Sequence, residues 1–229
     1  MANLKRTRRR FRFGLRSMLI IATLACVWIG WYSVRASNQR KAVLWGRNAG
    51  AGIKYDFEYD YDTKLPGNGT TSVPTWMHDL LGIDYFSTVV SFDLIDDEID
   101  DLTPIGQFTR LERLQLWGDK IDNFSGLSGL ANLKSLETTT PRVDDLGPLA
   151  ALTKLEYLLL NGSSAIDLSP LHGLTNLDVL KLINAPVSDL SPLAELKGLK
   201  RLQLKGVAVS EDEIARLQLA LPNCQIVVK

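Results

Sequence analysis

The chain repeats the same apolar pattern every 22 residues over more than half of its length. Each unit opens on an apolar residue, and nearly all of the positions three, five, thirteen and sixteen residues later are also apolar. The six opening residues are Val89, Leu111, Leu133, Leu155, Leu177 and Leu199. One such unit is too small to bury its own apolar side chains, so neighbouring units must stack and share a continuous core. The sequence therefore predicts a short solenoid over residues 89–209.

Each unit combines a strand pattern with a tighter return pattern. The first half reads L-x-x-L-x-L, and its alternation of buried and outward positions is typical of a short strand. The second half reads D-L-x-P-L, as in residues 145–149. Proline early in this return fixes φ and suits the first turn of a helix. We expect returns made of 3₁₀ helix or one turn of α-helix.

These motifs resemble the internalin-like class of leucine-rich repeats, from residue 89 to about residue 217. The resemblance implies an α/β fold: a right-handed leucine-rich repeat solenoid of short parallel strands with 3₁₀ or one-turn-helix returns. The whole layout also resembles bacterial membrane-anchored leucine-rich repeat proteins of unknown function. In those proteins an Arg-rich tail and a Trp-rich span precede a W-x-x-x-L-L-G segment, which corresponds here to residues 76–82.

The chain departs from the family where asparagines usually form a hydrogen-bonded ladder, eight residues into each unit. The residues at these positions are Asp97, Asp119, Pro141, Ser163, Ala185 and Val207. In the third unit Thr138 also replaces a core leucine, and Pro141 follows three threonines. We expect the third unit to be the least regular of the six.

The last unit lacks D-L-x-P-L and reads SEDEIARLQLALPNC instead. Ser210 followed by Glu213 is a capping-box pattern, which predicts the start of a true α-helix. We expect this helix and the apolar segment 225–228 to form a C-terminal cap over residues 210–229.

An uncharged apolar stretch, residues 17–34, follows a basic tail of residues 1–16. As a helix the stretch would be about 27 Å long, close to the roughly 30 Å of a hydrocarbon core. Trp28, Trp31 and Tyr32 lie at its end, where aromatic rings favour the headgroup interface. The pattern predicts a single-pass membrane helix with the N-terminus in the cytoplasm and the repeats periplasmic or extracellular, by the positive-inside rule.

A cleaved secretory signal is the alternative, since Val34 and Ala36 are small residues at the −3 and −1 positions of a cleavage site. The protein would then be secreted. Arg-rich segments with interleaved Phe can bind nucleic acid. Directly before an apolar span, however, such charges more often set topology or contact anionic lipid. We therefore expect no nucleic-acid partner for residues 1–16.

Residues 35–73 are predicted to hold a juxtamembrane helix, a strand and a loop. The strand is expected where Ile53, Tyr55, Phe57, Tyr59 and Tyr61 alternate with charged residues. Its aromatic face should pack against the end of the solenoid. Its acidic side chains, from residue 56 to residue 62, could hold calcium, but an extended strand does not curl around an ion, so a solvated face is favoured.

Residues 74–88 are predicted to form an amphipathic helix that caps the N-terminal end of the solenoid. Trp76, Leu80 and Leu81 share one helical face and would supply its apolar contact.

The outward positions of the six strands should line a concave surface. An apolar and aromatic band crosses its middle, and charge runs from acidic at the first strand to basic at the last. Aromatic residues and arginine are enriched at binding hot spots. The candidate partner-binding residues are Arg113, Gln115, Trp117, Glu137, Tyr157, Leu159, Val179, Lys181, Ile183, Arg201 and Gln203.

Motifs for catalysis are missing from the sequence. It has no Walker A, H-E-x-x-H or G-x-S-x-G pattern, and its two histidines, His78 and His172, have no ligand-type spacing. We expect no enzyme activity, no cofactor and no bound metal. The sequence favours a membrane-anchored protein-binding module. The alternatives are a self-assembling structural protein of the envelope, or a glycan-binding protein that uses Trp117 and Tyr157.

Overall fold

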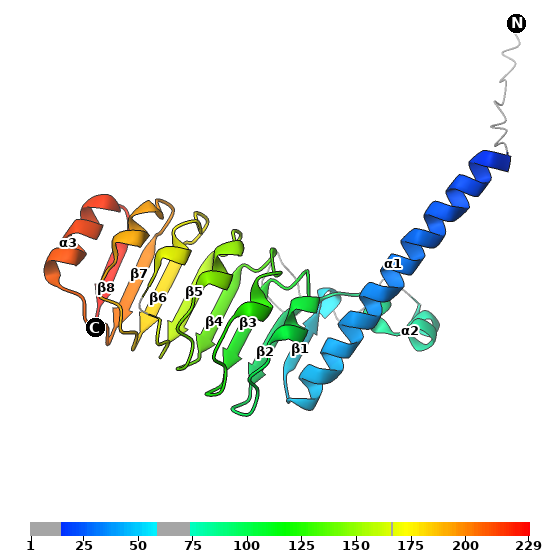
Figure 1. The fold of residues 1–229 in the computed structure, drawn as a ribbon, viewed down its shortest axis with the longest axis horizontal. Coiled ribbons are helices and arrows are strands. Elements are labelled where there is room, and N and C mark those ends of the chain that lie inside the picture. The colour runs from blue at the N-terminus through cyan, green and yellow to red at the C-terminus, as the bar shows by residue number, and fades with distance from the viewer. Residues whose placement is uncertain (1–14, 59–73, 166) are drawn as a thin grey trace, which may run out of the picture.

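The computed structural model describes residues 15–58, 74–165 and 167–229. An eight-stranded sheet runs along the molecule in the order β1 to β8 (Figure 1). Strands β2 to β8 are parallel, and β1 is antiparallel to β2. The strands are β1 Gly52–Tyr55, β2 Val89–Ile95, β3 Arg113–Trp117, β4 Ser135–Thr139, β5 Tyr157–Asn161, β6 Val179–Ile183, β7 Arg201–Lys205 and β8 Gln225–Val228.

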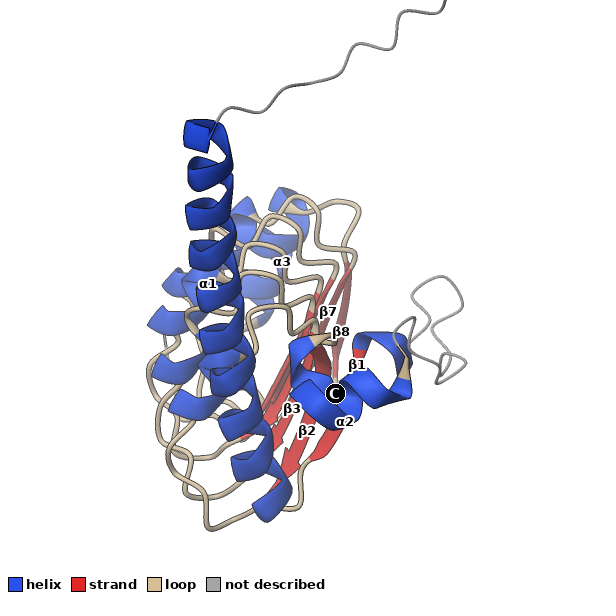
Figure 2. Cartoon of the chain, turned by 90° about the vertical axis from the view of Figure 1, so that its right-hand side faces the viewer, coloured by secondary structure: helices blue, strands red, loops and turns tan. Residues whose placement is uncertain are grey.

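Each pair of neighbouring repeat strands is joined by a return that contains a 3₁₀ helix, except the last, which contains an α-helix. The 3₁₀ returns are η3 Thr103–Gln107, η4 Ser125–Leu127, η5 Gly147–Ala151, η6 Ser169–Leu171 and η7 Ser191–Glu195. Figure 2 shows the strands gathered on one side of the molecule and these helices on the other. The leucines of the repeat lie between the two layers and are fully buried. The predicted leucine-rich repeat solenoid is confirmed.

The aspartate of each D-L-x-P-L motif holds the start of the return. The carboxylates of Asp101, Asp145, Asp167 and Asp189 accept hydrogen bonds of 2.7–2.8 Å from the backbone N–H two residues on. This is the local turn geometry that Asp favours before a helix. Hydrogen bonds from the hydroxyl and the N–H of the residue two positions on lower the pKa of Asp101, Asp167 and Asp189.

Contrary to the expectation, the strand of the third unit is as regular as the strands of its neighbours. Strand β4 has five residues and pairs in unbroken register on both sides. Thr138 is fully buried, and its hydroxyl donates to the Leu159 carbonyl at 3.4 Å. A threonine fits the core position because this bond satisfies its polar group. The neighbouring Thr140 hydroxyl is buried without a hydrogen-bond partner in the described residues.

The predicted span and the juxtamembrane segment form one continuous helix, α1 Leu15–Asn48. At 1.5 Å per residue, this helix is about 51 Å long. It ends where Gly50 adopts a left-handed φ of 72°, and the Ala51 N–H donates to the Gly46 carbonyl at 2.8 Å. A glycine just after the last turn is a common helix stop. By length and composition, residues 17–48 of this helix could cross a membrane, and their most apolar window is wholly exposed.

The second half of α1 caps the N-terminal end of the solenoid. Ala36, Gln39, Ala42, Val43 and Gly46 are buried at the spacing of one helical face. The Trp45 ring stacks on Phe92 of β2, with 6.1 Å between ring centroids. Gly46 lets the backbone approach, because a Cβ at this position would lie 2.6 Å from the Phe92 ring.

The predicted cap at residues 74–88 does not cover the solenoid. The segment contains α2 Thr75–Leu81 and η2 Ile83–Tyr85. In α2, Trp76, Leu80 and Leu81 are exposed by 63%, 72% and 47%. The prediction that these side chains close the solenoid is therefore wrong, since α1 already occupies the end of the core. Residues of η2 do pack beside α1, where Ile83 touches the core cluster.

The predicted aromatic strand is shorter than expected. Strand β1 ends at Tyr55, and Asp56–Glu58 form the 3₁₀ helix η1. The Glu58 carboxylate folds back to accept the Tyr55 N–H at 2.9 Å, which ends the extended pattern. Tyr55 is buried as predicted, and β1 pairs with the first repeat strand. Tyr59 and Tyr61 lie outside the described residues, as do two of the four calcium candidates, Asp60 and Asp62.

The C-terminal cap has the predicted helix and terminal strand. Helix α3 Glu211–Ala220 starts at Ser210, whose hydroxyl accepts the Glu213 N–H at 3.2 Å. The Glu213 carboxylate bonds the Leu190 N–H at 3.1 Å and so ties α3 to η7. Strand β8 extends the sheet beyond β7.

Candidate protein-binding face

The outward side chains of the repeat strands form three rows, because the strands pair without register shifts. The first row is Ser91, Arg113, Ser135, Tyr157, Val179 and Arg201. The middle row is Asp93, Gln115, Glu137, Leu159, Lys181 and Gln203. The third row is Ile95, Trp117, Thr139, Asn161, Ile183 and Lys205. We call these three rows the sheet face. All eleven candidate partner-binding residues belong to it, and each is half-buried or exposed.

The centre of the sheet face is an apolar patch on β5 and β6. Tyr157 lies opposite Val179, and Leu159 is two residues further along the same strand. The Lys181 ammonium lies 5.1 Å from the centroid of the Tyr157 ring, within the range of a cation–π contact. This contact holds the ring in place and keeps a positive charge beside the patch.

Trp117 and Ile183 do not join that patch into one continuous band. They belong to the same row but are three strand steps apart, which is about 14 Å. Thr139 and Asn161 lie between them and share a side-chain hydrogen bond of 3.3 Å. The sheet face therefore has two separate apolar anchor points, Trp117 on β3 and the Tyr157 patch on β5 and β6, and the polar pair separates Trp117 from Ile183.

The acidic end of the sheet face is also where β1 is added. Asp93 lies beside Lys54 of β1 and Arg113 of β3. Burial raises the pKa of the Asp93 carboxyl, and these two cations partly oppose that shift. One Asp93 carboxylate oxygen is buried without a hydrogen bond. At the other end Arg201 and Lys205 are exposed, so the predicted charge gradient along the sheet face is present.

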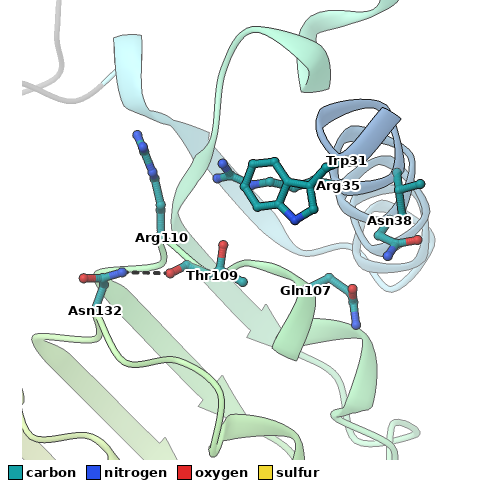
Figure 3. A pocket seen from close by; sticks show the side chains of 8 residues that line it. Trp31, Arg35, Asn38, Gln107, Thr109, Arg110 and Asn132 are labelled. Atoms are coloured by element: carbon teal, nitrogen blue, oxygen red, sulfur yellow. Dashed lines mark hydrogen bonds between the residues drawn. The ribbon is translucent and has the colours of Figure 1, made fainter. Parts of the chain in front are cut away.

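A hollow that sequence reasoning missed lies between α1 and the solenoid. It has a volume of about 450 Å³ and is lined by Trp31, Val34, Arg35 and Asn38 of α1. On the solenoid it is lined by Gln107, Thr109, Arg110 and Asn132 (Figure 3). Only the packing of α1 against the first repeat brings these two segments together. The sequence offered two signals. Arg35 lies close to Trp31, which is predicted at the headgroup interface, and Arg110 lies close to Arg113, a candidate partner-binding residue.

The described residues offer neither a metal-binding cluster nor an activated cysteine. No group of three or more His, Cys, Asp or Glu side chains there could hold a metal ion. Burial raises the pKa of the Cys224 thiol, which keeps it protonated and a poor nucleophile.

Solved structures similar to this chain include two leucine-rich repeat proteins. An internalin of Listeria monocytogenes is 27% identical, with a TM-score of 0.50, over 57% of this chain and 37% of its own. A leucine-rich repeat protein of Leptospira interrogans is 22% identical, with a TM-score of 0.54, over 67% of this chain and 39% of its own. The match thus spans less than half the length of either protein. No family model and no curated protein matches the chain.

The register of the strands, the 3₁₀ returns and the likeness to both structures agree with the 22-residue motif. The repeat part of this chain has an internalin-like leucine-rich repeat fold.

Proposed function

We propose that the chain is a membrane-anchored, non-catalytic module that binds a protein partner through the sheet face. The observation that carries the proposal is the arrangement of the three rows. They place Trp117 and the Tyr157 patch on a rigid parallel sheet, with arginine, lysine and glutamate side chains around them. Partly buried aromatic residues in a ring of polar ones are the usual composition of a binding hot spot.

The dimensions of the sheet face favour a macromolecular partner. From β3 to β7 it is about 19 Å wide, and its rows cover about 13 Å along the strands. A stable protein interface buries about 800 Å² on each partner. The rows alone are smaller than this, so a partner of ordinary affinity must also contact the turns beside the strands.

The membrane anchor is supported by the exposed first half of α1. The apolar stretch in residues 17–34 is uncharged, and its residues 17–31 are all exposed. The helix then continues without a break into the buried cap. A cleavage site after Ala36 would lie inside this helix, at a residue buried against the solenoid. That position supports a retained anchor over a cleaved signal.

Site-specific crosslinking in the native cell tests the binding proposal. A photo-crosslinking residue at position 157 should capture a defined protein, whereas the same residue at position 219 should not. Leu219 is a suitable control because it is 83% exposed on α3, away from the sheet face. The double change Trp117→Ala and Tyr157→Ala should then abolish capture from position 181. Leu219→Ala should leave it unchanged.

The result that would reject the sheet face is equal capture from positions 157 and 219, or capture that survives the double change. Stability must be compared in parallel by thermal melting. Both substituted side chains are only partly buried, so we expect a small change in the melting temperature.

A further inference from the structure

The hollow between α1 and the first repeat is positively charged and lies at the end of the apolar stretch of α1. Arg35 projects from α1 and Arg110 from the turn before β3, and both border the same space (Figure 3). Trp31 forms one wall, and the amide side chains of Asn38 and Gln107 are also part of the lining. Among the residues that the structure describes, no carboxylate lines this hollow. Its side chains therefore offer hydrogen-bond donors and positive charge to an anion.

The two guanidinium groups are available to such a ligand. Neither Arg35 nor Arg110 forms an ion pair within the described residues. A second hollow on the far side of Arg110 is lined by Asp56 and Glu112. The Glu112 carboxylate is already bound to Lys134 at 2.8 Å, and Asp56 accepts the Thr88 hydroxyl at 3.1 Å.

The solenoid side of the hollow is held by its own hydrogen bonds. The Asn132 amide donates to the Thr109 carbonyl at 2.9 Å, and its oxygen accepts the Lys154 ammonium at 2.7 Å. These bonds link the turns before β3, β4 and β5. The Arg110 side of the hollow is therefore supported before any ligand binds.

The hollow lies at the level where the apolar stretch of α1 ends. Trp31 and Val34 are in the last turn of that stretch, and Arg35 is the first charged residue after it. Tryptophan at the end of a membrane helix lies among the lipid headgroups. If residues 17–34 span the membrane, Arg35 and Arg110 lie at the depth of the lipid phosphates.

The two edges of the solenoid differ in charge, and the basic edge is the one that contains the hollow. The turns before the strands, on the same edge of the solenoid as the hollow, are residues 109–112, 131–134, 153–156, 175–178 and 197–200. They carry five basic and three acidic side chains, a net charge of +2. The turns after the strands are residues 96–101, 118–123, 140–145, 162–167 and 184–189. They carry eleven acidic and two basic side chains, a net charge of −9.

From these observations we propose that the hollow binds the headgroup phosphate of an anionic phospholipid, in the leaflet on the solenoid side of the membrane. Arg35 and Arg110 hold the phosphate between them, and Trp31 packs against the glycerol region. The bound lipid fixes the solenoid with its basic edge toward the membrane and its acidic edge away. The inference rests on the membrane anchor of the proposed function but not on its protein partner.

Native mass spectrometry of the full chain in detergent, with equal amounts of phosphatidylglycerol and phosphatidylcholine, tests the proposal. The wild-type chain should retain phosphatidylglycerol in preference to phosphatidylcholine. The double change Arg35→Gln and Arg110→Gln should reduce this preference by roughly fivefold for each charge removed. Arg142→Gln is the matched control, because Arg142 is exposed in a turn on the acidic edge.

Equal retention of the two lipids by the wild-type chain would overturn the proposal, and so would an unchanged preference in the double variant. If the wild-type chain binds inorganic phosphate but retains no phosphatidylglycerol, the site takes free phosphate and the lipid assignment is wrong. The single change at exposed Arg110 provides a second test if the double variant does not fold.

Two further measurements separate this proposal from the proposed function. A chain that alkaline carbonate extracts from membranes lacks the anchor, and both ideas then fail. A chain that stays in the membrane without lipid preference loses only the lipid site. Changing Trp117 and Tyr157 to alanine should leave phosphatidylglycerol retention unaltered.

Discussion

At the scale of single residues, Gly46 of α1 faces the Phe92 ring of β2 with no room for a side chain between them. Glycine is usually unfavourable inside a helix, by about 1 kcal/mol relative to alanine. Here its missing side chain lets the helix backbone reach the Phe92 ring, which is fully buried. The local cost is offset by closer packing of Trp45, Ala42 and Val43 on the first repeat.

We predict that Gly46→Ala destabilises the solenoid by about 1–3 kcal/mol, because its Cβ would overlap a ring that cannot move. Gly173→Ala is the matched control, since a Cβ there would meet no atom within 4 Å. Denaturant unfolding of the two variants measures the difference. Equal midpoints would show that α1 can shift away from β2 at little cost.

Three aspartates of the D-L-x-P-L motifs predict how the stability of the solenoid depends on pH. Hydrogen bonds lower the pKa of Asp101, Asp167 and Asp189 below the unfolded value. A lowered folded-state pKa gives stability that is present above the unfolded pKa of about 3.9 and is lost as the pH falls through the folded pKa.

We therefore predict that the unfolding midpoint falls as the pH is lowered below about 4. Asp189→Asn should reduce this dependence, because asparagine keeps an oxygen acceptor for the Ser191 N–H but does not titrate there. Asp144→Asn, a change at an exposed carboxylate, is the comparison. Identical pH profiles for Asp189→Asn and the wild type would contradict the prediction.

At the scale of elements, the two halves of α1 have different surroundings. Its first half is apolar and exposed on all sides, as a helix surrounded by lipid would be. Its second half buries one face on η2, η3 and β1. On that face Gln39 donates to the Ser87 carbonyl at 2.9 Å and to Asp84 at 3.2 Å. The Tyr55 hydroxyl donates to the same Asp84 oxygen at 2.9 Å.

These contacts predict different behaviour for two shortened chains. A chain that starts at residue 35 keeps the buried face of α1 and should fold with a cooperative thermal transition. A chain that starts at residue 49 loses Ala42, Val43 and Trp45 from the core cluster. Each large apolar side chain contributes about 1.5–3 kcal/mol, a large part of a typical stability of about 5–15 kcal/mol. We expect the chain that starts at residue 49 to aggregate.

If both chains melt at the same temperature, α1 is not the cap of the solenoid. Circular dichroism at matched concentration, with light scattering to detect aggregates, is sufficient for this comparison.

At the scale of the whole molecule, the helix continues from the apolar stretch to the cap without a break (Figure 1). A membrane helix joined in this way transmits its tilt to the solenoid, which a flexible linker would not do. The sheet face, the basic edge and the acidic edge are therefore presented in fixed directions relative to the first half of α1, the proposed anchor.

We predict that labels on the two edges lie at different distances from a bilayer. A fluorophore on Lys154→Cys, on the basic edge, should be quenched by headgroup-quencher lipids more strongly than one on Asp144→Cys. Cys26 is replaced by serine in both cases, and Cys224 is buried. Equal quenching at the two positions would mean that the solenoid rotates freely above the membrane.

By itself, the sequence determined the solenoid, its six units, the 3₁₀ returns and the residues of the sheet face. These features recur every 22 residues, and each depends on contacts between a unit and its immediate neighbours. The C-terminal cap was also predictable, because Ser210 and Glu213 mark a helix start through local hydrogen bonds.

Only the tertiary structure decided which segment covers the N-terminal end and which side chains of the sheet face come together. The apolar face of α2 and the buried face of α1 both look suitable for capping, and the choice depends on the fit of Gly46 and Trp45 to Phe92. The spacing of Trp117 from the Tyr157 patch depends on strand register. The hollow between Arg35 and Arg110 joins residues that are far apart in sequence, so no local pattern could reveal it.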